Sequence, residues 1–176
     1  MRNLGILLID MQEFFLDRKP NEDIKELIES QKKLFNFAYD NGIPIFALEY
    51  TDCGKTIEEL ISALSKNKTY FIPKYEINAF LVEHPPHSVQ DSLEIKYQNK
   101  ELKKRLAECR VKKLILTGIS KGACVLETAK GAKKRGYNLL TSEELTNKPE
   151  MKINWFYENS AHYETLQELL DAIPIN

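Results

Sequence analysis

The sequence has few cysteines and no cysteine pattern of a known kind. Only three are present among 176 residues, Cys53, Cys109 and Cys124, and they are widely separated. Three scattered cysteines are too few for a disulfide framework, and no pair has the CxxC spacing typical of a zinc site. We therefore expect free thiols and a cytoplasmic location.

The chain also lacks an excess of charge of either sign. Its 25 Lys and Arg residues stand against 26 Asp and Glu residues, for a formal net charge of −1. This balance gives no electrostatic reason to expect nucleic acid or an anionic membrane as a partner. No apolar run approaches the roughly 20 residues of a membrane-spanning helix. Met1 to Leu4 lead straight into an apolar strand pattern, so we expect no signal peptide. With no repeats, low-complexity tract or linker, we expect one domain over residues 1–176.

What the sequence does contain is an alternation of apolar runs and amphipathic segments. Leu4 to Ile9 is a continuous apolar run, typical of a strand covered on both faces. Ile24 to Ala38 has apolar residues at helical spacing, and Thr56 to Glu59 is a capping-box pattern that opens another helix. Further strands are expected at 43–48, 70–73, 111–117, 137–141 and 161–162, and further helices at 56–64, 99–109, 151–157 and 164–172. This order predicts an α/β fold with a mostly parallel sheet of five or six strands.

The segment from Leu114 to Tyr137 combines a buried strand, a glycine-bearing turn and an amphipathic helix, with Cys124 in the first helical turn. A thiol there lies near unpaired backbone N–H groups and the positive end of the helix dipole. Those surroundings favour the thiolate, which is the nucleophilic form. The alternative interpretation is a small buried apolar residue in the core.

Three polar residues stand where apolar strands end. Asp10 follows the first strand, Lys74 follows the third, and Cys124 lies just past the fourth. In an open parallel sheet, sites form outside the carboxyl ends of the strands, near the point where strand order reverses. If the first strand is central, the three side chains converge, and a carboxylate, an ammonium and a thiol together suit acyl-transfer chemistry. Taken singly, they could be a helix cap, a surface lysine and a core residue.

Three segments in order resemble the isochorismatase-like cysteine hydrolases. Leu7 to Phe15 is similar to the family's strand with D-x-Q-x-x-F, Pro73 to Phe80 to its K-x-x-x-S/N-A-F segment, and Thr117 to Val125 to its T-G-x-x-x-x-x-C-V turn. The third match continues through Leu126–Ala129 and Lys134–Tyr137. The resemblance covers nearly the whole chain.

The resemblance implies a three-layer α/β/α fold and a catalytic triad. Asp10 would be the general base, Lys74 would stabilise the thiolate, and Cys124 would attack a carbonyl carbon to give a thioester. It also implies a cis peptide bond between Ile119 and Ser120, and an oxyanion hole made by the N–H groups of Ser120 and Cys124. A small-molecule substrate and a homo-oligomer, a dimer or larger, are expected by the same analogy.

The sequence departs from the nicotinamidases of this family, which carry an Asp-x-His metal motif after the second strand. The matching region, 49–56, has no histidine. His84 and His87 flank Pro85 and Pro86, without a third ligand nearby, in a weakly patterned excursion at 75–98. We therefore expect neither a metal nor another cofactor, and nicotinamide becomes a less favoured substrate.

Four aromatic residues are candidates to line the substrate pocket: Phe15, Tyr50, Tyr75 and Phe80. Ordinary core or interface packing is the alternative for each of them. Lys121 could meet an anionic group of the substrate, although a solvent-facing role is the simpler expectation.

Three functions are compatible with these residues. The first is a cysteine hydrolase of a small amide, ureido or related acyl compound. The second is a binding or scaffold protein that has kept the fold without catalysis. The third is an isochorismate-type vinyl-ether hydrolase, although family members with that activity lack the cysteine. The presence of Asp10, Lys74 and Cys124 together favours the first.

Overall fold

A parallel sheet forms the centre of the computed structural model, which describes residues 3–17, 21–83, 97–147 and 153–174. The sheet has six strands in the order β3-β2-β1-β4-β5-β6, and every neighbouring pair is parallel. The strands are β1 (Leu4–Ile9), β2 (Ile45–Tyr50), β3 (Thr69–Lys74), β4 (Lys113–Gly118), β5 (Asn138–Ser142) and β6 (Ala161–Tyr163). The strand order reverses at β1, where the chain moves from one half of the sheet to the other.

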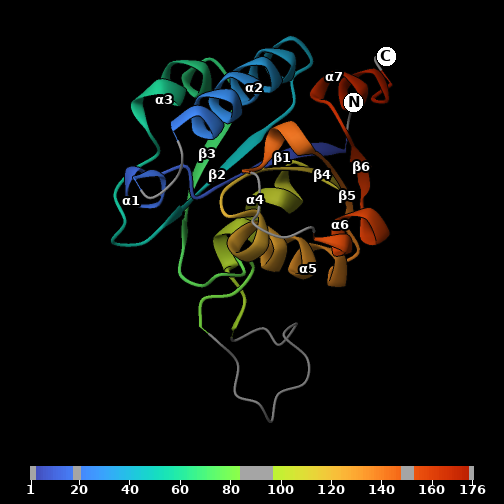
Figure 1. Cartoon of the computed structure of the whole chain (residues 1–176). Coiled ribbons are helices and arrows are strands. Elements are labelled where there is room, and N and C mark those ends of the chain that lie inside the picture. The colour runs from blue at the N-terminus through green and yellow to red at the C-terminus, as the bar shows by residue number, and fades with distance from the viewer. Residues whose placement is uncertain (1–2, 18–20, 84–96, 148–152, 175–176) are drawn as a thin grey trace.

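Helices cover both faces of the sheet, which confirms the predicted α/β/α layers (Figure 1). One face carries α2 (Asn21–Asp40), α3 (Glu58–Ser65) and α7 (Leu166–Asp171). The other carries α4 (Lys100–Glu108), α5 (Leu126–Lys134) and α6 (Asn154–Asn159). Three short elements lie near the strand ends: α1 (Glu13–Leu16), the π-helical turn η2 (Lys121–Val125) and the 3₁₀ turn η3 (Glu143–Leu145).

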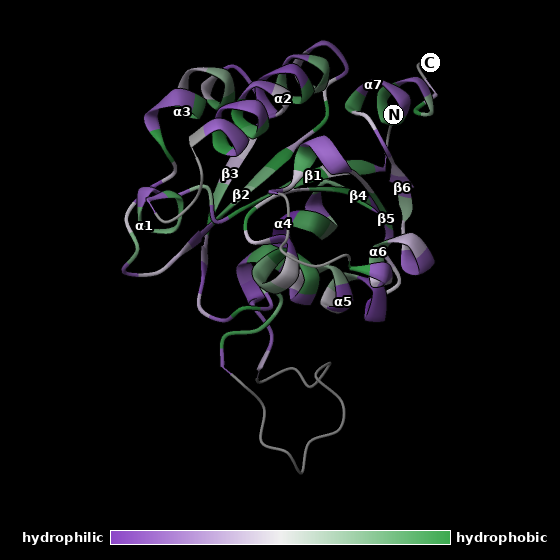
Figure 2. Ribbon diagram, viewed as in Figure 1, coloured by the Kyte–Doolittle hydropathy of each residue, from purple (hydrophilic) through white to green (hydrophobic). Residues whose placement is uncertain are grey.

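Two apolar cores explain why β1 is a continuous apolar run. Ile6 and Leu8 face the core beneath α2 and α3, whereas Leu7 and Ile9 face the core above α4 and α5. All six residues of β1 are buried. Figure 2 shows the same pattern, with apolar colour along the central strands and hydrophilic colour on the outward surface of α2. The central position of β1 meets the condition on which the predicted convergence of side chains depends.

The expected elements agree with the structure apart from their ends and one helix start. The predicted capping box at Thr56 is wrong: α3 begins at Glu58, and its N-cap, Ile57, makes no side-chain cap. The N–H and hydroxyl of Thr56 instead donate to Oε1 of Glu49, at 2.9 and 3.0 Å. Leaving the buried carboxylate of Glu49 without hydrogen-bond donors would cost more free energy than leaving α3 without a side-chain cap. Thr56 therefore donates to Glu49.

The excursion predicted at 75–98 is closed at its base by an antiparallel bridge between Leu81 and Gln98. The N–H of Val82 donates to the carbonyl of Tyr97 at 2.8 Å. Residues 84–96, including His84 and His87, lie outside the described residues, as do Met151 and Lys152 of the predicted helix at 151–157. Within the ranges that the structure describes, no helix is long and apolar enough to cross a bilayer.

Candidate active site

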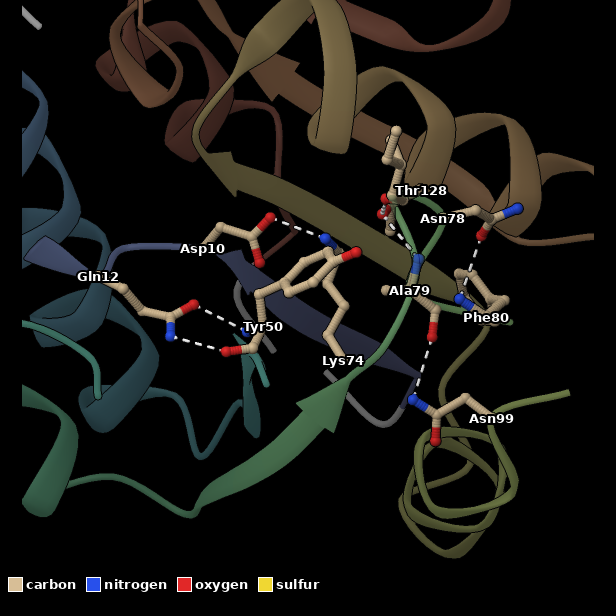
Figure 3. A network of polar contacts seen from close by, with 10 residues as sticks. Asp10, Gln12, Tyr50, Lys74, Asn78, Ala79, Phe80, Asn99 and Thr128 are labelled. Carbon is tan, nitrogen blue, oxygen red and sulfur yellow. Dashed lines mark hydrogen bonds and ion pairs between the residues drawn. The ribbon is translucent and has the colours of Figure 1, made fainter. Parts of the chain in front are cut away.

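The ends of β1 and β3 bring two charged side chains into contact. Oδ2 of Asp10, just after β1, lies 2.8 Å from Nζ of Lys74, the last residue of β3. The two side chains are 1% and 0% exposed. Figure 3 shows them pointing toward each other from separate strands. The predicted convergence thus holds for this pair, as a fully buried ion pair at the carboxyl edge of the sheet.

A sharp turn sets the direction of the Asp10 side chain. Its backbone has φ 53°, in the left-handed region that aspartate tolerates better than most residues. Its N–H continues the sheet pattern to the carbonyl of Leu48, while its own carbonyl accepts from the N–H of Gln12 at 2.9 Å. Oδ1, the oxygen that does not contact Lys74, is buried and has no hydrogen-bond partner among the described residues. It is therefore the oxygen available to accept a proton.

The ammonium of Lys74 is stabilised from two sides. Besides Asp10, the ring of Tyr50 covers it, with 4.4 Å between Nζ and the ring centroid. Tyr50 and Lys74 are direct neighbours across β2 and β3, so the strand register fixes this contact. Burying an ammonium is costly unless a partner compensates for its lost hydration. The Asp10 carboxylate supplies the opposite charge, and the face of the Tyr50 ring adds a favourable cation–π contact.

Cys124 lies in η2, the turn that follows β4 and runs into α5. The N–H groups of Ala123 and Val125 both donate to the carbonyl of Ser120, at 3.0 and 3.1 Å. The amide of Cys124, between them, is not a donor to that carbonyl. The peptide bond between Ile119 and Ser120 is cis.

The pKa of the Cys124 thiol is raised to about 11, first by burial and then by the charge of Asp10, while Lys74 acts in the opposite direction. Burial also raises the pKa of Asp10, and Lys74 and Cys124 oppose this rise. Each of the two pKa values responds to the other side chain and to Lys74, as expected of a thiol close to the ion pair. The expectation that a helix start favours the thiolate is wrong for the resting site, because burial and a neighbouring carboxylate outweigh the turn's dipole. The thiol is protonated at neutral pH, so its activation needs a base.

Gln12 holds the loop after β2 against the site. Its Nε2 donates to the carbonyl of Tyr50 at 3.0 Å, and its Oε1 accepts from the N–H of Tyr50 at 2.8 Å (Figure 3). Nε2 also donates to the carbonyl of Gly54 at 2.7 Å. The side chain is fully buried. The sequence pattern D-x-Q contained this residue, but its positioning of Tyr50 follows only from the fold.

Two further residues, which sequence reasoning missed, hold the segment after Lys74. Asn99, the N-cap of α4, donates through Nδ2 to the carbonyls of Pro73 and Ala79 at 2.9 and 3.1 Å. Thr128 of α5 accepts from the N–H of Ala79 at 3.1 Å. Figure 3 shows Ala79 held between them. The only sequence signal was the position of Asn99 just before a helical pattern.

The four predicted pocket residues lie in different surroundings. Tyr50 is at the site, and the ring of Phe15 meets it edge to face with centroids 6.1 Å apart. Tyr75 follows Lys74 and is exposed. Phe80 is buried in the core, with its ring 5.9 Å from that of Tyr137. The structure thus brings Phe15 and Tyr50 together beside Lys74, whereas the position of Phe80 favours the packing alternative.

Lys121 does not face solvent, so that expectation is wrong. Its side chain is 3% exposed, and its Nζ lies 2.5 Å from Oε2 of Glu143. In the part of the chain that the structure describes, no group of three or more His, Cys, Asp or Glu side chains could hold a metal ion.

Comparison with known proteins agrees with this fold. The family model of the isochorismatase domain matches residues 5–151. Nicotinamidase from Staphylococcus aureus is a similar solved structure, with 19% identity, a TM-score of 0.68, and coverage of 94% of this chain and 100% of that one. N-carbamoylsarcosine amidase from Thermoplasma acidophilum is another, with 14% identity, a TM-score of 0.66, and coverage of 92% and 94%. The YcaC gene product of Escherichia coli, an octameric hydrolase of unknown specificity, has 17% identity, a TM-score of 0.69, and coverage of 96% and 78%.

At these identities, the structural likeness shows the fold alone. A comparison with curated protein sequences finds no match. The family model, however, covers most of the chain, from the start of β1 past β5 and η3, and so includes all three strand ends of the site. The chain therefore belongs to the isochorismatase domain family.

Proposed function

We propose that this protein is a cysteine-dependent hydrolase of a small amide, ureido or related acyl compound, acting through a thioester intermediate. Membership of a hydrolase family supports the reaction class. The observation that carries the proposal is the buried Asp10–Lys74 ion pair beside a protonated Cys124 thiol. A nucleophile, a base and a fixed cation are the parts that acyl transfer requires.

In the first half of the reaction, Oδ1 of Asp10 takes the thiol proton as the sulfur of Cys124 attacks the carbonyl carbon. The carbonyl electron pair moves onto oxygen, where the N–H groups of Ser120 and Cys124 stabilise the negative charge. When the tetrahedral intermediate collapses, the C–N bond breaks, and Asp10 returns its proton to the leaving nitrogen. The products of this half are the thioester and the free amine or ammonia.

In the second half, a water molecule attacks the thioester carbon while Asp10 accepts one of its protons. The C–S bond breaks, the acid leaves, and the proton returns to the sulfur. Lys74 stabilises the thiolate as Asp10 takes the proton, and it stabilises the Asp10 carboxylate again once that proton has passed to the leaving group. Its contact with Asp10 also keeps one carboxylate oxygen occupied, which leaves Oδ1 as the proton acceptor.

An amide or ureido substrate is favoured over a vinyl ether because Cys124 is present. Two of the similar solved structures, a nicotinamidase and an N-carbamoylsarcosine amidase, support the same class of bond. Nicotinamide is the less favoured of these, since residues 49–56 contain no histidine for the metal motif of the nicotinamidases. We also propose a homo-oligomer, in line with the octameric YcaC product, and a cytoplasmic protein of one domain.

Acylation of the purified protein by p-nitrophenyl acetate tests the proposal. Mass spectrometry should find one acetyl group on Cys124, formed in a burst of p-nitrophenol and lost by hydrolysis. Cys124→Ala should abolish the burst, whereas the matched variants Cys53→Ala and Cys109→Ala should keep it. A burst that survives in Cys124→Ala would exclude the covalent mechanism. A wild type with neither acylation nor turnover of an amide panel would support the scaffold alternative instead.

A further inference from the structure

A second cluster of charged and polar side chains lies next to the proposed oxyanion turn, and the mechanism above does not use it; its Lys121 and His162 side chains are buried, whereas Glu143 is partly exposed and Tyr157 is exposed. Its centre is Glu143, the first residue of η3. Oε2 of Glu143 pairs with Nζ of Lys121 at 2.5 Å. Oε1 accepts from the hydroxyl of Tyr157 at 2.8 Å and lies 3.0 Å from Nε2 of His162. The turns after β4 and β5, the helix α6 and the strand β6 thus meet at one carboxylate.

Lys121 is the link between this cluster and the turn. It follows Ser120 directly and precedes Cys124 by three residues, so it lies between the two amides assigned to the oxyanion hole. Its backbone is fixed as well as its side chain, since its N–H donates to Oδ1 of Asn147 at 2.8 Å. One residue of the turn is therefore held at two points by the segment 143–147.

The segment 143–147 is itself fixed to the sheet. The hydroxyl of Thr117, on β4, donates to the carbonyl of Leu145 at 2.7 Å, and Gly118 forms a bridge with Thr146. The turn is thus connected through the segment 143–147 to the central strand β4. Burial of the Lys121 side chain would be costly without a partner, and the pairing with Glu143 offsets that cost.

We propose that Glu143 is a positioning residue for the hydrolase reaction: through its ion pair with Lys121, it holds the Ser120–Cys124 turn in the geometry that stabilises the oxyanion. The assignment rests on the proposed function. Lys121 acts from behind the turn, and its side chain is directed to Glu143 and not to the substrate. Tyr157 and His162 keep the carboxylate in place.

The charge state of the cluster agrees with this role. Burial acts to raise the pKa of Glu143, but hydrogen bonds from Lys121 and Tyr157 outweigh it, and the pKa is lowered. Burial lowers the pKa of His162, and the charge of Lys121 adds to that effect, while Glu143 opposes it. At neutral pH, Glu143 is therefore ionised and the imidazole beside it is neutral.

Two reactions of the Cys124 sulfur distinguish a loss of oxyanion positioning from a general disturbance of the site. Acylation by p-nitrophenyl acetate passes through a tetrahedral oxyanion, whereas alkylation by iodoacetamide does not. Losing one oxyanion donor costs about 10²–10³ in kcat, so a partly displaced turn should lose about tenfold. Glu143→Gln should therefore slow the acylation burst about tenfold and leave the alkylation rate of Cys124 within about twofold, with kcat reduced and KM little changed.

The chain offers a matched control in the next residue. Glu144 also accepts a hydrogen bond, from the N–H of Leu166 at 2.6 Å, but the ion pair of Lys121 is with Glu143. Glu144→Gln should leave the ratio of acylation to alkylation unchanged. Lys121→Met should lower that ratio as Glu143→Gln does, and the double variant should be no worse than either single one, because both remove the same interaction. Glu143→Asp should restore part of the ratio.

The assignment is overturned if Glu143→Gln and Lys121→Met keep the wild-type ratio, or if Glu144→Gln lowers it equally. Losses that multiply in the double variant would also overturn it. If Glu143→Gln fails to fold, Lys121→Met alone decides by the same ratio. A wild type that shows no acylation at all refutes the proposed function, and the assignment with it, and is recognised before any variant is made.

Discussion

Replacing Asp10 by asparagine should make Cys124 react faster with one reagent and slower with its substrate. In the wild type, the positive charge of Lys74 is paired with Asp10, and the thiol keeps its proton. Asparagine has nearly the same shape but no charge. The thiolate then becomes the only anion in the site for Lys74, so the thiol loses its proton more easily and its pKa falls.

The size of the effect follows from the pKa of the thiol. At about pH 7.5, a thiol with a pKa of about 11 is ionised in about one molecule in 3,000. Asp10→Asn removes the carboxylate's part of the rise and leaves that of burial, so a return to the ordinary pKa of 9.0 is the upper limit and would raise the ionised fraction about 100-fold. A less basic thiolate is also less nucleophilic, which cancels about tenfold of this gain. Alkylation by iodoacetamide should therefore be faster than in the wild type, by at most about tenfold.

Hydrolysis should change in the opposite direction. Asp10→Asn has no base to take the thiol proton or return it to the leaving group, and the loss of a general base costs about 10²–10⁴ in rate. The assay compares iodoacetamide alkylation of Cys124, followed by mass spectrometry of the labelled peptide, with turnover of the best amide substrate. Asp52→Asn, on the adjacent loop, is the control and should change neither rate by more than about twofold.

A parallel fall of both rates in Asp10→Asn would refute this reasoning. That result would mean that Asp10 maintains the thiolate in the resting enzyme, as in a site where the nucleophile is already charged. It would also mean that burial and the carboxylate do not set the pKa of Cys124. The same variant read only by hydrolysis would not distinguish the two cases, because activity is lost in both.

Three further changes test the supports of the site. Gln12→Ala should lower the free energy of unfolding by about 2–3 kcal/mol in urea titration, because it leaves backbone groups of the loop 50–54 without partners, whereas Gln12→Glu should lose at least as much, because its buried carboxylate keeps the acceptor but turns an oxygen toward two carbonyl oxygens. Asn99→Asp keeps the helix-cap acceptor but loses both donors, so it should cost about 1–3 kcal/mol and expose the segment after β3 to faster amide exchange. The pKa of His162 is lowered in the folded protein, so as pH falls the unfolded chain binds a proton at this histidine first, near the ordinary pKa of 6.5. The free energy of unfolding should therefore fall as pH drops below about 6.5. His162→Gln should flatten that part of the plot of stability against pH, while the loss of stability from protonation of Glu143 at lower pH stays.

The fold could be predicted because its signals are local. A strand buried on both faces, such as Leu4 to Ile9, needs apolar residues at every position, and that demand is visible in the sequence. Parallel strands then send their carboxyl ends to one edge, so Asp10 and Lys74 could be paired without coordinates. Most of the predicted site therefore followed from the positions of the strand ends.

The long-range polar contacts could not be predicted, because their partners lie far apart in the chain. The Thr56 capping box was an acceptable local solution, but Glu49 offered the same donor a buried charge. Lys121 and Glu143 are 22 residues apart, in a turn and a 3₁₀ segment that no periodicity connects. A lysine among small residues in a polar turn has the composition of a surface loop, and only the packing of the segment after β5 and of α6 against the turn buries it.

The pKa of Cys124 is raised where the sequence predicts a lowered one, and this difference also comes from contacts between distant parts of the chain. It affects how the site would react. A helix start is visible in the sequence, but burial and the approach of Asp10 depend on what packs around the turn, and these effects are larger. A thiol that stays protonated at rest is protected from oxidation and from passing electrophiles, since both react with the thiolate. In the proposed mechanism, it becomes nucleophilic only as its proton moves to Asp10, when a carbonyl group is in place to accept the sulfur and the turn held by Lys121 is ready for the oxyanion. Reactivity in this site is therefore a property of the complex with substrate, and labelling rates of the free protein alone would underestimate it.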